Sequence, residues 1–309
     1  MTDPVRPTRT AVVVNPTKIA SDFEPVVTGA LQEAGWAPPI WLETTPEDPG
    51  LGMARAALEE GVEVVLVAGG DGTVRHVAHA LSGSQTALGI VPSGTGNLLA
   101  RNLGLPLDVD GALRVILAGH RRRIDLIEIS ADDRPAESFA VMAGAGVDSA
   151  IMSDVDPELK KKLGPAAYFM TVGKALGRLP LNAVIQVDRH RPRKRRAMLV
   201  LVGNVGALPG GIDLLPHARA DDGLLHVFVA SPHRVRDWVL VAVRILTRRA
   251  RKGDTIDSVS GETVRVSIDR AEDYQLDGDV IGSCRRFEAV VKPAALTVLV
   301  GEPAPDAPR

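Results

Sequence analysis

The sequence predicts a two-domain protein, in which an α/β domain with a parallel sheet is followed by a mostly antiparallel β-sandwich domain. The chain has 309 residues, which is long enough for two domains. Strand and helix signals alternate over roughly the first 125 residues, as in a parallel sheet covered by helices. Beyond residue 130 short strand-like runs follow one another between turn residues, which indicates antiparallel pairing.

The N-terminal region gives its elements in a regular order. Strands are expected over 10–16, 39–45, 62–68, 86–92 and 122–129. A helix that stops at Gly35 follows the first strand, and the next helix ends at Gly61. After the third strand, Val74, Val77, Ala78 and Leu81 share one helical face. Two further helices are expected over 98–104 and 110–119.

The C-terminal region reads as short strands interrupted by two helices. The strands are expected over 138–146, 182–188, 197–204, 223–230, 263–269, 274–279, 287–292 and 296–300. The helical insertions cover 157–179 and 233–253, and the Pro-rich tail after residue 301 is expected to be disordered.

Composition narrows the class of protein. Cys284 is the single cysteine, which excludes an internal disulfide framework and a cysteine zinc cluster and favours a reducing cytoplasm. The first residues lack the apolar stretch of a secretory signal, and no run reaches the ~18 apolar residues of a membrane span. We therefore expect any contact with a membrane to be peripheral.

Two runs concentrate positive charge, at 189–196 and 248–252. They are either solvated loops or a face that attracts anionic lipid headgroups, and composition does not separate the two. The helix over 234–250 is apolar at 238–246 and carries Trp238, which suits an interfacial helix and a core helix equally. Nucleic acid is not an expected partner, because the basic runs lack interleaved aromatic residues.

Two glycine-rich turns between a predicted strand and a predicted helix carry the first functional signal. One runs from Gly69 to Thr73 and the other from Ser93 to Asn97. Glycines let backbone N–H groups approach an anion, and the following helix adds a positive dipole. Neither turn has the lysine of a P-loop or the GxGxxG spacing. Two such turns at carboxyl ends of strands in one sheet favour phosphate binding.

Asp71 in the first turn has two interpretations. An aspartate beside a helix N-terminus can simply cap it, which contributes ~1 kcal/mol. A carboxylate that faces a phosphate must instead hold a metal or take a proton, because it is otherwise repulsive. The three glycines around Asp71 favour the second interpretation.

The ordered motifs resemble the catalytic domain of the diacylglycerol kinase family, which includes bacterial lipid kinases, sphingosine kinases and ceramide kinases. The match consists of "NP" at 15–16, "GGDGT" at 69–73, "PSGTGN" at 92–97, "AGAGVDS" at 143–149, "LLPHARADDGLLHV" at 214–227 and "QLDGDVIG" at 275–282. "GGDGT" alone is shared with NAD kinases and phosphofructokinases. The ordered set covers nearly the whole chain and is more specific.

The resemblance implies a fold and a set of site residues. An NAD kinase/phosphofructokinase-like domain over 1–127, to which the chain returns at about 294–309, would bind ATP beside a lipid-substrate domain over 128–293. The implied ATP-binding residues are Asn15, Pro16, Thr45, Gly69, Gly70, Asp71, Gly72, Thr73, Gly94, Thr95 and Asn97. The implied Mg²⁺ residues are Asp125, in a water-linked network, and Asp222 in a structural loop, together with main-chain oxygens near Arg219 and Leu224. On residues alone, "ADDG" at 220–223 reads as an ordinary β-turn.

Two residues depart from the family pattern. Leu98 stands where bacterial diacylglycerol kinases often have an aspartate, which weakens the implied magnesium network. Asp279 stands where the family has a glutamate that activates the lipid hydroxyl. An aspartate offers the same carboxylate with roughly 1.5 Å less reach, and a base must come within hydrogen-bond distance of its proton.

The resulting hypothesis is an ATP-dependent lipid kinase that acts on a diacylglycerol-like lipid from the cytoplasmic side of a membrane. Asp71 and Asp279 are its expected catalytic residues. Two alternatives stay open: a soluble NAD kinase, and a non-catalytic nucleotide- or lipid-binding homologue. Against the NAD kinase alternative, the chain lacks the Asn-Glu signature that NAD kinases carry after the second turn. The choice of lipid, and of monomer or homodimer, is left open.

Overall fold

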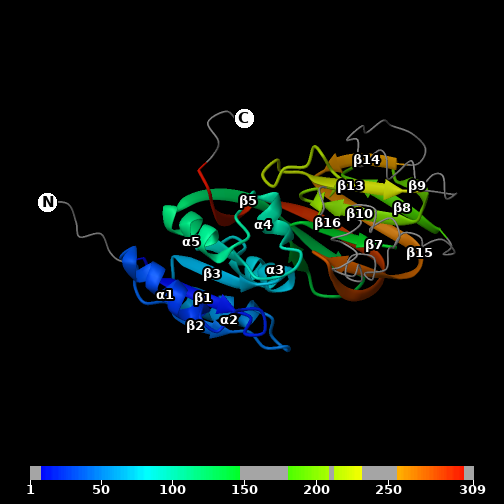
Figure 1. The fold of residues 1–309 in the computed structure, drawn as a ribbon. Coiled ribbons are helices and arrows are strands. Elements are labelled where there is room, and N and C mark those ends of the chain that lie inside the picture. The colour runs from blue at the N-terminus through cyan, green and yellow to red at the C-terminus, as the bar shows by residue number, and fades with distance from the viewer. Residues whose placement is uncertain (1–7, 147–179, 209–211, 232–255, 303–309) are drawn as a thin grey trace, which may run out of the picture. The chain divides into compact units, whose positions relative to one another are not determined.

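The computed structural model describes residues 8–146, 180–208, 212–231 and 256–302 (Figure 1). The chain divides into two compact units. Unit 1 comprises residues 1–124 and 294–309, and unit 2 comprises residues 125–293. Among the described residues, no helix has the length and apolar character needed to span a membrane.

Unit 1 is built on a parallel sheet. Its strands lie in the order β2-β1-β3-β4, and the C-terminal end of β16 pairs with β4. Their bounds are β1 Thr10–Val14, β2 Ile40–Glu43, β3 Val64–Gly69, β4 Ala87–Pro92 and β16 Asp279–Val300. β1, β3 and β4 are buried along their whole length, which explains their continuous apolar runs.

Helices α1 to α5 connect and cover these strands. Their bounds are α1 Phe23–Glu33, α2 Leu51–Glu59, α3 Asp71–Leu81, α4 Leu98–Asn102 and α5 Val109–Ala118. One core cluster joins α1 and α5 to alternate residues of β1 and β3, such as Val12 and Leu66. The intervening Val13 and Val65 face the other way and are also buried, so both faces of the sheet are covered.

Unit 2 is an antiparallel β structure. Its strands follow the order β14-β13-β10-β7-β15-β16, and β8 with β9 extends from β15. The bounds are β5 His120–Ala131, β6 Glu137–Phe139, β7 Met142–Ala145, β8 Leu181–Val187, β9 Arg193–Ala197, β10 Leu199–Gly203, β11 Ala207–Leu208, β12 Ile212–Asp213, β13 Leu225–Ala230, β14 Ile256–Gly261 and β15 Thr263–Leu276. Alternate residues of these strands form one core, which includes Phe139, Val200, Leu225 and Phe287.

The predicted fold class is confirmed, with differences in detail. The runs expected at 263–269 and 274–279 belong to one strand, β15, and those at 287–292 and 296–300 belong to β16. Both strands are longer than an ordinary strand, and in β15 the irregular pairing between Ser267 and Glu272 lies where the sequence signal is interrupted. The helices expected over 157–179 and 233–253, the basic run 248–252 and the tail from 303 lie outside the described residues.

Candidate active site

The predicted nucleotide residues lie at the carboxyl edge of the parallel sheet in unit 1. Asn15 follows β1, Thr45 follows β2, and the two glycine-rich turns follow β3 and β4. Backbone hydrogen bonds hold these strand ends together, from the Asn15 N–H to the Ala68 carbonyl (2.9 Å) and from the Ser93 N–H to the Gly69 carbonyl (3.2 Å). This edge is where parallel α/β sheets bind their ligands.

The two glycine-rich turns pack directly against each other. A Cβ on Gly94 would lie 2.7 Å from the Gly70 Cα, which no real Cβ tolerates. A Cβ on Gly69 would lie 2.7 Å from the Cβ of Thr73, a buried residue in the first turn of α3. The glycines are therefore required for the close approach of the two backbones.

Asp71 joins the two turns. One of its carboxylate oxygens accepts the Asn97 N–H (2.9 Å) and the other accepts the Leu98 N–H (2.5 Å). Asn97 has a positive φ of 49°, and its side chain bonds both the N–H and the carbonyl of Gly94. The capping interpretation of Asp71 is thus correct in part, but the helix that it caps is α4 and not its own helix α3.

The N-cap residue of α3 is Gly70, which has no side chain with which to bond the first-turn amides. Backbone amides at a helix N-terminus, with the helix dipole behind them, suit an anion such as a phosphate group. Asn15 and Thr45 are already engaged in local turns, with Thr17 and Asp48 respectively.

In unit 2, the predicted base Asp279 follows a two-residue hairpin turn formed by Asp277 and Gly278. Both turn residues have a positive φ, of 49° and 99°, as a type I′ hairpin requires. Asp279 is the first residue of β16, pairs with Leu276 and is exposed. A carboxylate in this position is accessible to a substrate hydroxyl.

Asp277 has a structural role that the sequence did not reveal. Its carboxylate accepts the N–H groups of Ala140 (3.0 Å), Val141 (3.0 Å) and Met142 (2.8 Å), and it is only 4% exposed. Buried Asn204 binds the same segment, because its side chain donates to the Ala140 and Asp125 carbonyls. The Asp-Gly pair is a hairpin signal that was available in the sequence.

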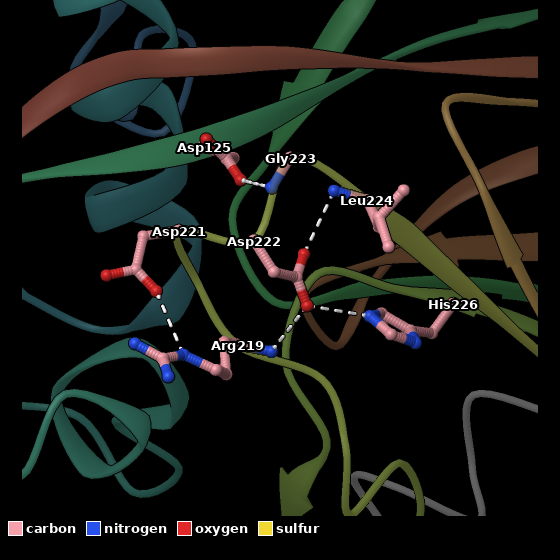
Figure 2. A network of polar contacts seen from close by, with 7 residues as sticks. All are labelled: Asp125, Arg219, Asp221, Asp222, Gly223, Leu224 and His226. Carbon is pink, nitrogen blue, oxygen red and sulfur yellow. Dashed lines mark hydrogen bonds and ion pairs between the residues drawn. The ribbon is translucent and has the colours of Figure 1, made fainter. Parts of the chain in front are cut away.

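The residues predicted to hold a structural Mg²⁺ meet in one loop before β13 (Figure 2). The Asp222 carboxylate accepts the N–H groups of Arg219 (3.1 Å) and Leu224 (2.9 Å) and contacts His226 Nε2 (3.0 Å). Buried Asp125 accepts the Gly223 N–H (2.7 Å), and its own N–H donates to the Ala220 carbonyl (2.6 Å).

This loop does not fit a resident cation. A hard cation takes six or more oxygen ligands, whereas Arg219 and Leu224 direct N–H groups at Asp222. The Arg219 carbonyl accepts the Asp222 N–H. Within the described ranges, no three acidic, histidine or cysteine side chains gather in a metal-binding cluster. The carboxylate of Asp71 likewise faces N–H groups. The predicted cation site at Arg219, Asp222 and Leu224 is therefore not supported by the geometry of this loop, and the expected water-linked role of Asp125 stays a prediction.

Comparison with known proteins identifies the family. Residues 9–129 match the profile described as the diacylglycerol kinase catalytic domain, and residues 141–300 match the YegS C-terminal NAD kinase β sandwich-like domain. A protein of Klebsiella pneumoniae named "Probable lipid kinase YegS-like" is 30% identical over 253 residues, 78% of each chain. The diacylglycerol kinase of Mycobacterium tuberculosis is 30% identical over 250 residues, 80% of each chain. The chain belongs to the diacylglycerol kinase family.

Solved structures agree with this fold. A diacylglycerol kinase from Bacillus anthracis superposes with a TM-score of 0.74 at 22% identity, over 95% of this chain and 97% of that one. An NAD kinase from Archaeoglobus fulgidus in complex with ATP superposes with a TM-score of 0.54 at 12% identity, over 96% and 94%. Membership of this family supports a lipid kinase enzyme, and the family implies ATP as co-substrate.

Proposed function

We propose that this protein transfers the γ-phosphate of ATP to a hydroxyl group of a diacylglycerol-like lipid. The observation that carries the proposal is the pair of glycine-rich turns that Asp71 ties together beside the N-terminus of α3, where the N-cap residue is a glycine. Phosphoryl transfer depends on positioning and charge neutralisation more than on covalent chemistry by the protein. Preorganised backbone amides supply both without reorganisation during the reaction.

In this proposal the nucleotide enters as Mg·ATP, with the ion carried by the phosphate oxygens and water. The amides of Gly70 to Thr73 bind the phosphates, and the turn at Gly94 to Asn97 forms the opposite wall. Asp71 keeps the two turns at a fixed separation through its bonds to Asn97 and Leu98. Its negative charge also orients the cation-bearing side of Mg·ATP.

Asp279 takes the role of the base. Its carboxylate accepts the proton of the lipid hydroxyl while that oxygen forms a bond to the γ-phosphorus. The bond between the γ-phosphorus and the β,γ-bridging oxygen breaks, and ADP leaves with the bonding electrons. The products are ADP and a phosphorylated lipid, and the proton returns to solvent from Asp279.

The deciding experiment is a radiolabelled-ATP assay against diacylglycerol, monoacylglycerol, a sphingoid base, phosphatidylglycerol and NAD. Label in the diacylglycerol product, lost in Asp279→Asn, is expected. Label in NAD alone would replace the proposal with a soluble NAD kinase. ATP binding without label in any acceptor would identify a non-catalytic homologue.

We propose further that the protein attaches to an anionic, cytoplasm-facing membrane surface through the β8–β9 hairpin of unit 2. The part of the basic run at 193–196 forms most of β9, which was expected as a loop or an anion-binding face. Among described residues β9 pairs only with β8, and Arg191, Lys194 and Arg196 are exposed there without a carboxylate partner. Two acids lie near them: Asp188 accepts the N–H groups of Glu262 and Thr263, and Asp269 accepts from the backbone and side chain of Asn182.

Vesicle flotation tests this attachment. Each basic residue near an anionic surface contributes about 1 kcal/mol, so Arg191→Gln/Lys194→Gln/Arg196→Gln should weaken partitioning roughly 100-fold. The matched control is Arg114→Gln/Arg121→Gln/Arg123→Gln, which removes the same charge from exposed positions of unit 1. Equal loss in both variants, or no binding to phosphatidylglycerol vesicles at low salt, would refute the hairpin as the attachment site.

A further inference from the structure

The Asp222 loop of unit 2 is closed by donors from the protein itself. Three donors meet its carboxylate: two backbone N–H groups from the same loop and the His226 side chain (Figure 2). A carboxylate can only accept, so His226 Nε2 carries the proton in this contact. Two carboxylate oxygens have about four acceptor positions, and the three donors use most of them.

Charge argues against a cation in the same place. The N–H dipoles of Arg219 and Leu224 point their positive ends at Asp222, which a divalent ion on the same oxygens would oppose. The neighbouring acid Asp125 accepts from the Gly223 N–H, so it also faces the loop backbone. On Oδ2, which accepts from both Arg219 and His226, a cation could enter only by displacing one of these two donors.

His226 is held in position by its strand. It lies on β13, where its backbone pairs with Gly203 of β10 on one side and with Ser260 of β14 on the other. The side chain is 11% exposed and that of Asp222 is 18% exposed. The imidazole therefore reaches Asp222 from a rigid sheet, and a contact to a charged group in a partly dry site is stronger than a surface contact.

We propose that His226 closes the Asp222 loop in place of a divalent cation, so that unit 2 keeps this loop folded without bound Mg²⁺. The full chain, without nucleotide, should unfold at the same temperature in EDTA and in millimolar Mg²⁺. Hydrogen exchange at residues 214–226 should also be equal in the two buffers. An unfolding temperature or amide protection that falls in EDTA and returns with Mg²⁺ would overturn the proposal.

Substitutions test the role of the imidazole directly. His226→Leu removes the donor and should lower the unfolding temperature of unit 2 by roughly 4–8 °C, with faster exchange at 214–226. His226→Gln keeps an N–H donor and should restore much of the loss. The control is His217→Leu, an exposed histidine of the same segment, which should change neither quantity.

The readouts separate this proposal from the kinase function, because none of them uses ATP or lipid. Wild-type stability that ignores Mg²⁺, combined with a loss in His226→Leu and recovery in His226→Gln, supports the proposal. A His226→Leu variant as stable and as protected as the wild type would overturn it.

Discussion

Asp71 in unit 1 and Asp277 in unit 2 have the same structural role in different surroundings. Each binds backbone N–H groups of a segment far away in sequence: Asp71 at residues 97–98, and Asp277 at residues 140–142. Asp277 is buried and is followed two residues later by a separate exposed carboxylate, Asp279. Asp71 is only partly buried and stands at the proposed phosphate site itself.

In the proposed mechanism, the structural and catalytic tasks are distributed differently in the two units. In unit 2 they fall on two residues, so a substitution at Asp277 and one at Asp279 should give opposite signatures. In unit 1 they fall on one residue, so no substitution of Asp71 separates them cleanly. Stability and activity measured on the same variants test whether the two tasks are separate in unit 2 and combined in unit 1.

The largest effect is expected from Asp277→Ala. The change leaves three buried N–H groups without an acceptor, which should cost about 3–5 kcal/mol in the stability of unit 2. Hydrogen exchange of peptides that cover 137–145 and 274–290 measures this loss. Asp277→Asn keeps one acceptor oxygen and should lose less. A stable Asp277→Ala protein would show that the three bonds are dispensable.

Asp279 should show the reverse pattern. Asp279→Asn keeps the shape but removes the base, so kcat/KM should fall about 10²–10⁴-fold. Stability should change by no more than about 0.5 kcal/mol because the residue is exposed. Asp279→Glu extends the reach by one methylene and should retain or raise activity. Full activity in Asp279→Asn would remove the base role.

For Asp71→Asn we expect loss of activity together with a stability loss of about 1–3 kcal/mol in unit 1. An asparagine has one acceptor oxygen, and its amide N–H₂ must then face the Asn97 or Leu98 N–H. Trp36 and Trp41, both in unit 1, report the unfolding by fluorescence. An inactive variant with wild-type stability would mean that the two bonds contribute little.

Two glycines at the contact between the turns form a matched pair. A Cβ on Gly94 would lie 2.7 Å from the Gly70 Cα, whereas one on Gly70 would lie at an ordinary 3.8 Å from the Gly94 Cα. Gly94→Ala should therefore cost about 1–3 kcal/mol and weaken ATP binding, and Gly70→Ala should cost well under 1 kcal/mol. Isothermal titration with Mg·ATP and thermal unfolding measure both. Equal effects would contradict the close packing of the turns.

Much of this architecture was predictable from the sequence because its signals are local. The parallel strands of unit 1 are fully buried apolar runs, and each glycine-rich turn follows one of them directly. The contacts that matter most were not predictable, because they join residues far apart. Asp71 reaches Asn97, Asp277 reaches Ala140, and neither distance leaves a periodic pattern. A carboxylate whose partners are backbone N–H groups has no sequence signature at the partner positions.

The loop at Asp222 shows a second reason why some contacts could not be predicted from the sequence. The family resemblance implied a cation site there, although the residues alone indicate a β-turn. A motif identifies acidic residues and not the direction of the N–H groups around them. His226, four residues later, was read only as part of an apolar strand run. His226 contacts Asp222 because β13 places it beside the loop, and this placement depends on the fold and not on the local sequence.

The smallest predicted effect is a loss of stability at alkaline pH, and it should be confined to unit 2. Burial raises the pKa of the Cys284 thiol to about 11, from a usual value near 9, and burial also raises the pKa of Tyr274. The unfolded chain then loses these protons at a lower pH than the folded chain. Stability should be constant below about pH 9 and fall as the pH rises toward 11.

Denaturant unfolding at pH 7, 9 and 10.5 measures this slope, with hydrogen exchange assigning it to a unit. Cys284→Ala should reduce the loss that begins near pH 9, while the part due to Tyr274 remains. The described part of unit 1 contains neither a cysteine nor a tyrosine, so its unfolding should lack this component. An alkaline loss of the same size in both units would mean that general charge repulsion, and not these two buried side chains, is its cause.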